Sequence, residues 1–217
     1  MLSPRWPVVL FDLDGTLVNT IPLIVASYQH AVRAVIGEAL EARVARQWIG
    51  QTLASTFAGA YPDHASEMIR AYIEFGDAQT PALLKRYPGM DEALVDLSGA
   101  GARLGVVTSK HHVVAQDTLD AAGLGGLISL TATMEDTRTH KPDPAPLLLA
   151  AARLGVADAG TVVYVGDAVV DVLSAKAAGM DVIAVSWGAG ERNDLVAAGP
   201  TSLADTVDEL RALLLQR

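Results

Sequence analysis

The sequence of residues 8–16 is VVLFDLDGT, in which four apolar residues run directly into two aspartates that are two positions apart. The apolar run from Val8 to Phe11 is typical of a buried parallel strand. Carboxylates at the end of such a strand indicate a functional role, because burying an unpaired acid is unfavourable. Asp12 and Asp14 are therefore the first candidate catalytic residues.

Four more short runs rich in β-branched residues lie further along the chain. They span residues 104–108, 128–134, 162–165 and 182–186. Segments with helical periodicity follow them, at residues 112–122, 144–154, 170–178 and 206–215. This alternation predicts an α/β fold with a doubly wound, mainly parallel sheet. Ligands bind such sheets beyond the carboxyl ends of the strands, so the residues there are the ones expected to carry chemistry.

Residues 17–85 interrupt the alternation of strands and helices. They show helical periodicity and no convincing strand, which predicts an inserted all-helical domain. We therefore expect a core domain of residues 1–16 and 86–217 and a helical domain of residues 17–85. The helical segment carries a net charge of −1 and the rest of the chain −8, so the acidic surplus belongs to the core.

The composition of the chain excludes several classes of protein. A net charge of −9 argues against binding to nucleic acid or anionic lipid. The hydrophobic content of 51% excludes a disordered chain, and the absence of cysteine excludes disulfides, thiolate metal sites and cysteine catalysis. No run approaches the roughly twenty apolar residues of a membrane span, and we see no signal peptide. We expect a cytoplasmic protein.

A second pair of acids follows the apolar run at residues 162–165. Asp167 comes directly after it, and Asp171 lies four positions later on the same side of the first turn of the next predicted helix. Like charges placed so closely repel each other unless a cation is bound. An all-carboxylate set without thiols suits a hard cation such as Mg²⁺.

Hydroxyl and ammonium groups follow two other predicted strands. Thr108, Ser109 and Lys110 end the strand at 104–108, and Lys141 stands before Pro142 at the start of a predicted helix. Together with the four acids, these donors predict an anion pocket that contains a metal ion.

The motifs DLDGT, TS, KPDP and GDxxxD, in that order, resemble the haloacid dehalogenase (HAD) superfamily over essentially the whole chain. The resemblance implies a Rossmann-like core and a mobile cap formed by the helical insert. It implies that Asp12 attacks phosphorus to form an aspartyl-phosphate, and that Asp14 protonates the leaving oxygen and then activates water. Lys141 would hold phosphoryl oxygens and steady Asp12.

The resemblance also implies how the metal and the phosphate are bound. Asp12, Asp167 and the main-chain carbonyl of Asp14 would bind Mg²⁺, and Asp171 would complete or anchor that set. The expected phosphate- and substrate-binding residues are Thr108, Ser109, Lys110, Gly15, Thr16 and Gln51. Gln51 is included because Trp48-Ile49-Gly50-Gln51 occupies the cap position where phosphoglycolate phosphatases approach their substrate.

The choice of substrate within the superfamily stays open. Asp14 disfavours dehalogenases, whose leaving group needs no proton. The resemblance favours a small phosphate ester such as phosphoglycolate, whereas Asn19, Lys110 and the run at residues 134–137 are similar to pyrophosphatase-like members. Sugar-phosphate phosphatases or mutases and a non-enzymatic phospho-acceptor are the further alternatives. The oligomeric state is not predicted.

Overall fold

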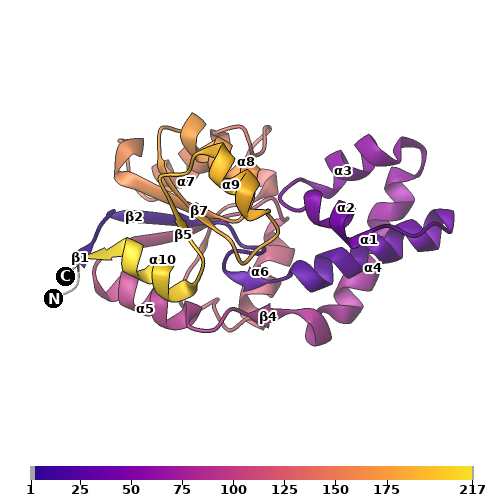
Figure 1. Cartoon of the computed structure of the whole chain (residues 1–217), viewed down its shortest axis with the longest axis horizontal. Coiled ribbons are helices and arrows are strands. Elements are labelled where there is room, and N and C mark those ends of the chain that lie inside the picture. Colours follow the sequence, from indigo (N-terminus) through magenta and orange to yellow (C-terminus); the bar gives the residue numbers. More distant parts are fainter. Residues whose placement is uncertain (1–2, 217) are drawn as a thin grey trace.

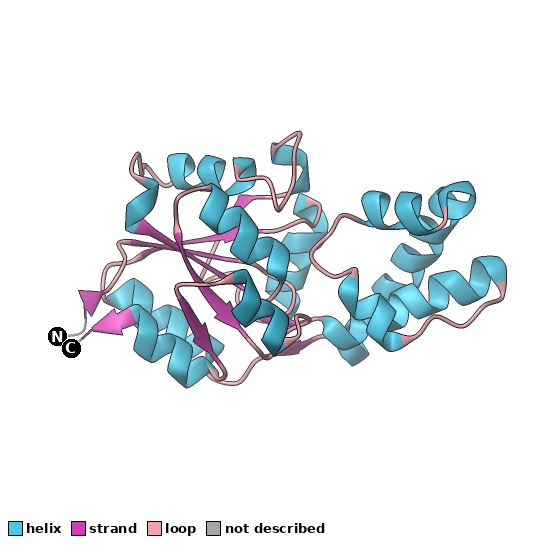
Figure 2. Ribbon diagram, turned by 45° about the horizontal axis from the view of Figure 1, so that its top comes forward, coloured by secondary structure: helices cyan, strands magenta, loops and turns pink. Residues whose placement is uncertain are grey.

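A six-stranded parallel sheet forms the centre of the computed structural model, which describes residues 3–216. Across the sheet the strands are β6 (Leu130–Ala132), β5 (Arg103–Val107), β2 (Val8–Phe11), β7 (Val162–Gly166), β8 (Asp181–Val185) and β9 (Ser202–Ala204). Every pairing within it is parallel. Helices cover both faces (Figure 2), so the predicted doubly wound α/β fold is confirmed.

Each face of the sheet has its own layer of helices and its own apolar core. One layer holds α5 (Met90–Gly99), α6 (His112–Ala121) and α10 (Val207–Leu214), and the other holds α7 (Ala145–Arg153), α8 (Val169–Ala177) and α9 (Arg192–Ala198). Alternate residues of β2 serve the two cores: Val9 and Phe11 pack into the first, Val8 and Leu10 into the second. The strand is buried on both sides, as its continuous apolar run predicts.

Four helices lie to one side of the sheet, beyond the carboxyl ends of its strands (Figure 1). They are α1 (Ile21–Ile36), α2 (Ala42–Gln47), α3 (Leu53–Ala60) and α4 (Ala65–Leu83). These helices bury a separate apolar cluster, in which Tyr28 contacts the rings of Trp48, Phe57 and Tyr72 at centroid distances of 4.8–5.5 Å. Ala189, from the loop after β8, packs into the same cluster.

A short antiparallel ribbon joins the four helices to the sheet domain. In it β3 (Val18–Asn19) pairs with β4 (Lys85–Arg86). The expectation that residues 17–85 contain no strand is therefore wrong at both ends, because two-residue strands are too short to give an alternating pattern. A similar ribbon of β1 (Ser3–Pro4) and β10 (Leu215–Gln216) holds the two ends of the chain together.

The predicted elements differ from the observed ones mainly at the edges of the sheet. In place of the predicted strand 128–134, the structure has a shorter strand, Leu130–Ala132. Its end is set by a 3-10 turn at Met134–Asp136, which Thr133 caps. Strand β9, a three-residue edge strand, was not predicted from the sequence. Two further 3-10 turns are Pro62–His64 and Ala159–Thr161. Within residues 3–216, no helix is both long and apolar enough to cross a bilayer.

Candidate active site

The first acid motif lies where β2 leaves the sheet, beside β7. The backbone N–H of Asp12 donates to the carbonyl of Val165, at 2.8 Å, and so continues the pairing of β2 with β7. Chain order reverses between these two strands, because β5 and β6 lie on one side of β2 and β7 to β9 on the other. Such a switch point is where doubly wound sheets bind ligands.

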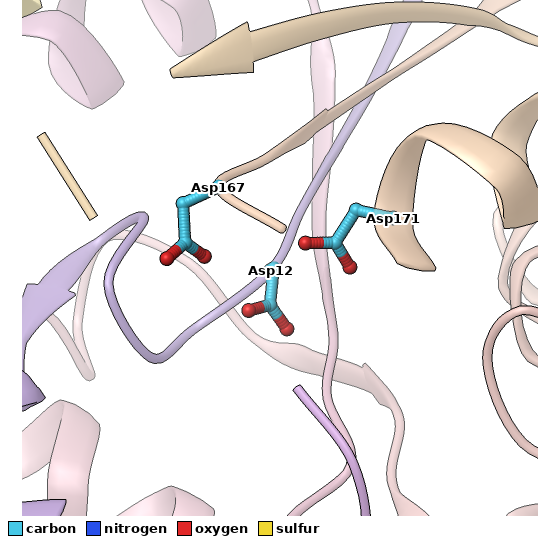
Figure 3. A group of neighbouring side chains, drawn as sticks. All are labelled: Asp12, Asp167 and Asp171. Atoms are coloured by element: carbon cyan, nitrogen blue, oxygen red, sulfur yellow. The ribbon is translucent and has the colours of Figure 1, made fainter. Parts of the chain in front are cut away.

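Asp12, Asp167 and Asp171 converge at this point, as Figure 3 shows. Asp167 follows β7 directly and Asp171 lies in the first turn of α8. All three are buried, and each offers a carboxylate oxygen within 4.8 Å of the others. The structure therefore brings together three of the four acids that the sequence analysis assigned to the metal.

Hydrogen bonds hold the carboxylates of this cluster in place. Asp167 accepts from the Thr16 hydroxyl at 3.1 Å and from the backbone N–H of Ala189 at 2.6 Å. Asp171 accepts from the backbone N–H of Ala168 at 3.0 Å, at the start of α8. Both carboxylates are thus oriented before any ligand arrives.

Lys141 is the ammonium group that faces this cluster. Its Nζ donates to Asp12 Oδ1 at 2.8 Å, to Asp171 Oδ1 at 2.7 Å and to the Tyr164 hydroxyl at 3.0 Å. The side chain of Lys141 is 2% exposed. The two carboxylates raise the pKa of Lys141 well above its usual range despite burial, so the group is charged.

One ammonium does not balance three buried carboxylates. Burial raises the pKa of Asp12 to about 7, against the attraction of Lys141 and with the added repulsion of Asp171. Burial and the charge of Asp12 also raise the pKa of Asp167 well above its usual range. A bound divalent cation would supply the missing positive charge, and the all-oxygen donor set fits Mg²⁺.

The carboxylate of Asp14 lies outside this cluster. It accepts from the Thr20 hydroxyl at 2.6 Å and from Lys110 Nζ at 2.5 Å. Lys110 is placed by its own backbone N–H, which donates to the Thr108 hydroxyl at 3.2 Å. Asp14 thus has a different electrostatic partner from Asp12, although the two lie two residues apart.

Gly15 allows the motif to turn at this point. Its φ of +81° lies in the left-handed region, and a Cβ built there would stand 2.3 Å from Asp167 Oδ2. Its N–H donates to the carbonyl of Val18 at 2.8 Å, and the Trp187 indole N–H donates to the carbonyl of Thr16 at 3.2 Å. The glycine is required for backbone geometry and for the close approach of the Asp167 carboxylate.

A cavity of about 290 Å³ lies between the strand ends and the helices α1, α3 and α4. Its lining includes Asp12, Asp14, Thr108, Ser109, Lys110 and Gln51. The Ser109 hydroxyl donates to the carbonyl of Gly50 at 3.0 Å, and this bond joins the strand ends to the loop between α2 and α3. Of the predicted site residues, Gly15, Thr16, Lys141, Asp167 and Asp171 lie around the acid cluster and not among the cavity's lining.

Sequence reasoning missed Tyr164 and Thr20. Tyr164 lies inside β7 among valines, and its hydroxyl contacts Lys141 and donates to the carbonyl of Val107 at 3.2 Å. A tyrosine in an otherwise apolar buried strand needs a polar partner, and this was the available signal. Thr20 is fully buried and carried no signal in the sequence.

The fold and the acid cluster define a Rossmann-like α/β enzyme core with a helical insert after its first strand. A family model described as haloacid dehalogenase-like hydrolase matches residues 9–185. The match covers most of the chain, so the chain belongs to this family. The predicted superfamily and the prediction of a hydrolytic enzyme are thereby confirmed.

Particular relatives extend this comparison. The pyrophosphatase PpaX of Bacillus velezensis is 33% identical over 210 residues, 97% of either chain. The probable phosphatase IndB of Dickeya dadantii is 38% identical and covers 94% of this chain and 91% of its own. A haloacid dehalogenase-like hydrolase from Bacteroides fragilis superposes with a TM-score of 0.85 at 26% identity, covering 95% of this chain and all of its own.

Proposed function

We propose that the chain is a Mg²⁺-dependent phosphohydrolase that cleaves a small phosphate monoester through an aspartyl-phosphate. The observation that carries the proposal is the Asp12 carboxylate, which lines the cavity while Lys141 and two further acids surround it. Family membership and the relatives named phosphatase or pyrophosphatase support it.

Each residue has a distinct role in the proposed reaction. An Asp12 oxygen attacks phosphorus, the bond from phosphorus to the leaving oxygen breaks, and that oxygen takes a proton from Asp14. Asp14 then removes a proton from water, the resulting hydroxide attacks phosphorus, and the Asp12–phosphorus bond breaks to release phosphate. Thr108 and Lys141 hold the phosphoryl oxygens.

Charge is the main obstacle to this reaction, because a carboxylate and a phosphate dianion repel each other. Mg²⁺ held by Asp12, Asp167 and the Asp14 carbonyl would offset this charge, with Asp171 completing the set. Lys141 contributes a further positive charge by binding Asp12 and Asp171 at once. Lys110 and Thr20 orient the Asp14 carboxylate through their hydrogen bonds.

We further propose that residues 17–85 act as a cap over a core of residues 1–16 and 86–217. The cavity lies between these parts, and the Ser109–Gly50 hydrogen bond joins them across it. Closure of the cap would exclude water while the aspartyl-phosphate forms. Gln51, in the loop between α2 and α3, lies at the cavity and would approach the substrate from the cap. A cytoplasmic location stays part of this proposal.

Two substrates follow from the resemblance and the relatives. Phosphoglycolate is the ester expected from the sequence motifs. Pyrophosphate, an anhydride and not an ester, is the alternative substrate, supported by the name of the Bacillus velezensis relative. Both carry a second anionic group beside the phosphoryl group that is transferred.

Asp12→Asn tests the proposed function. We expect it to abolish Mg²⁺-dependent release of phosphate from p-nitrophenyl phosphate, because an amide cannot act as the nucleophile. The matched control is Asp63→Asn, which makes the same change at an exposed position and should keep full activity. Circular dichroism should show that both variants are folded. Metal-dependent turnover by Asp12→Asn would refute the proposal.

A further inference from the structure

The side of the cavity formed by the helices is apolar. Leu23, Ile24, Leu53, Ile69, Tyr72 and Ile73 line this side, together with the hydroxyl-bearing side chains of Ser27, Tyr28 and Thr80. Among the described residues of α1 to α4 that line it, none is lysine, arginine or histidine, and one, Asp77, is acidic. A leaving group that extends from the phosphoryl site toward these helices therefore meets mainly hydrocarbon, a few hydroxyl groups and one negative charge.

The basic side chains that line the cavity, Lys110 and His111, come from the sheet domain and already have acidic partners. Lys110 binds Asp14 at 2.5 Å, and His111 Nδ1 lies 2.8 Å from Glu135 Oε1. Arg43 and Arg46 of α2 line a neighbouring cavity of about 310 Å³ beside α8 and α9, which shares Ile49 and Gln51 with this one, and neither arginine is among the residues that line the cavity at Asp12. A second anionic group on the helical side would thus be desolvated with hydroxyl groups but no cation as its partner, which is unfavourable.

The mouth of the cavity is apolar as well. Ile73 on α4 is 45% exposed and Val114 on α6 is 44% exposed, and both line the cavity. Burial of such surface by a ligand is favourable in proportion to the apolar area removed from water. Apolar side chains therefore line the cavity where its walls reach the solvent.

We propose that the substrate is the phosphate monoester of an uncharged, apolar alcohol with a small alkyl or aryl group. This inference rests on the proposed function and specifies its substrate class. It places phosphoglycolate and pyrophosphate among the poor substrates, because both present a second anion to the apolar side. No cation on α1 to α4 attracts that second anion, and the carboxylate of Asp77 repels it.

A series of primary alkyl phosphates tests the inference with Mg²⁺ and the full chain. Ethyl, propyl and butyl phosphate have leaving groups of almost equal acidity, so differences in kcat/KM report contacts with the cavity. We expect kcat/KM to rise by about fourfold for each methylene that becomes buried. Phosphoglycolate and pyrophosphate should both fall below ethyl phosphate.

A pair of variants distinguishes the effect of a charge at the cavity from the effect of the same charge elsewhere on the surface. Ile73→Lys places a cation at the mouth and should lower the ratio of kcat/KM for butyl phosphate over phosphoglycolate by roughly fivefold, the effect of a partly exposed ion pair. Val95→Lys makes a similar change at an exposed position on α5, which is not among the cavity's lining residues, and should leave the ratio unchanged.

The outcomes distinguish the two proposals. If none of these compounds, nor p-nitrophenyl phosphate, is hydrolysed, the proposed function fails and the inference fails with it. If phosphoglycolate or pyrophosphate has a higher kcat/KM than every alkyl phosphate, the phosphohydrolase stands and the apolar substrate class is overturned. The apolar substrate class is also overturned if kcat/KM is equal for ethyl, propyl and butyl phosphate.

Discussion

We expect Lys141→Met to destabilise the protein strongly in the absence of metal. The substitution keeps an unbranched side chain of similar length but removes the ammonium group that lies 2.8 Å from Asp12 Oδ1 and 2.7 Å from Asp171 Oδ1. Both carboxylates then stay buried without their cation, beside Asp167. Each ion pair contributes an attraction of about 6 kcal/mol at an effective dielectric constant of about 20.

The net effect is smaller than this attraction, because the unfolded state regains the hydration of all three groups. Removing one partner of a buried ion pair lowers the free energy of unfolding by about 3–5 kcal/mol. For a chain of this size that corresponds to a fall of roughly 6–20 °C in Tm. The measurement is thermal unfolding followed by circular dichroism in EDTA at neutral pH.

Lys85→Met is the matched control, because Lys85 is exposed on β4. We expect its Tm to change by no more than a few degrees, as surface charges contribute about 1 kcal/mol or less. Adding Mg²⁺ should raise the Tm of wild type and of Lys141→Met, since the cation balances the same carboxylates. A Lys141→Met protein with the Tm of wild type in EDTA would refute the buried acid–ammonium cluster.

Two further predictions concern the turn after Asp12 and a carboxylate on the surface. Gly15→Ala should weaken Mg²⁺ binding, measured by calorimetry, at least tenfold, because the added Cβ would meet Asp167. The control is Gly37→Ala, where φ is a similar +77° but the space is open, and this variant should bind Mg²⁺ as tightly as wild type. Equal affinities of the two variants would contradict the steric argument. Burial raises the pKa of Glu135, but hydrogen bonds, including one with His111, outweigh it and lower that pKa from 4.5 to about 2. The free energy of unfolding should therefore fall as the pH drops from 4.5 toward 2, and urea titrations of Glu135→Gln should show a smaller fall; identical pH profiles would exclude this role.

The sheet could be predicted where strands are buried on both faces. The run at residues 8–11 matches β2 because a central strand needs apolar residues at every position. Edge strands lack this constraint, which is why Ser202–Ala204 was missed. The ribbon of β3 and β4 depends on pairing between distant residues and leaves no local pattern.

The acid cluster could be predicted for a geometric reason. Parallel strands end at one edge of the sheet, so Asp12 and Asp167 must lie close once β2 and β7 are neighbours. The partner of each acid could not be predicted, because it depends on where long side chains reach. The pairing of Asp14 with Lys110, and of Lys141 with both Asp12 and Asp171, is visible only in three dimensions.

The ribbon that joins the four helices to the sheet places both ends of the insert side by side, since Val18 pairs with Arg86 and Asn19 with Lys85. Residues 20–84 are therefore attached like the loop of a hairpin, and a short turn could close the chain in their place. The helices also bury their own apolar cluster, so the sheet loses little of its core without them. The architecture is modular: the helical insert can change in length and sequence while the strands that position the acids stay unchanged.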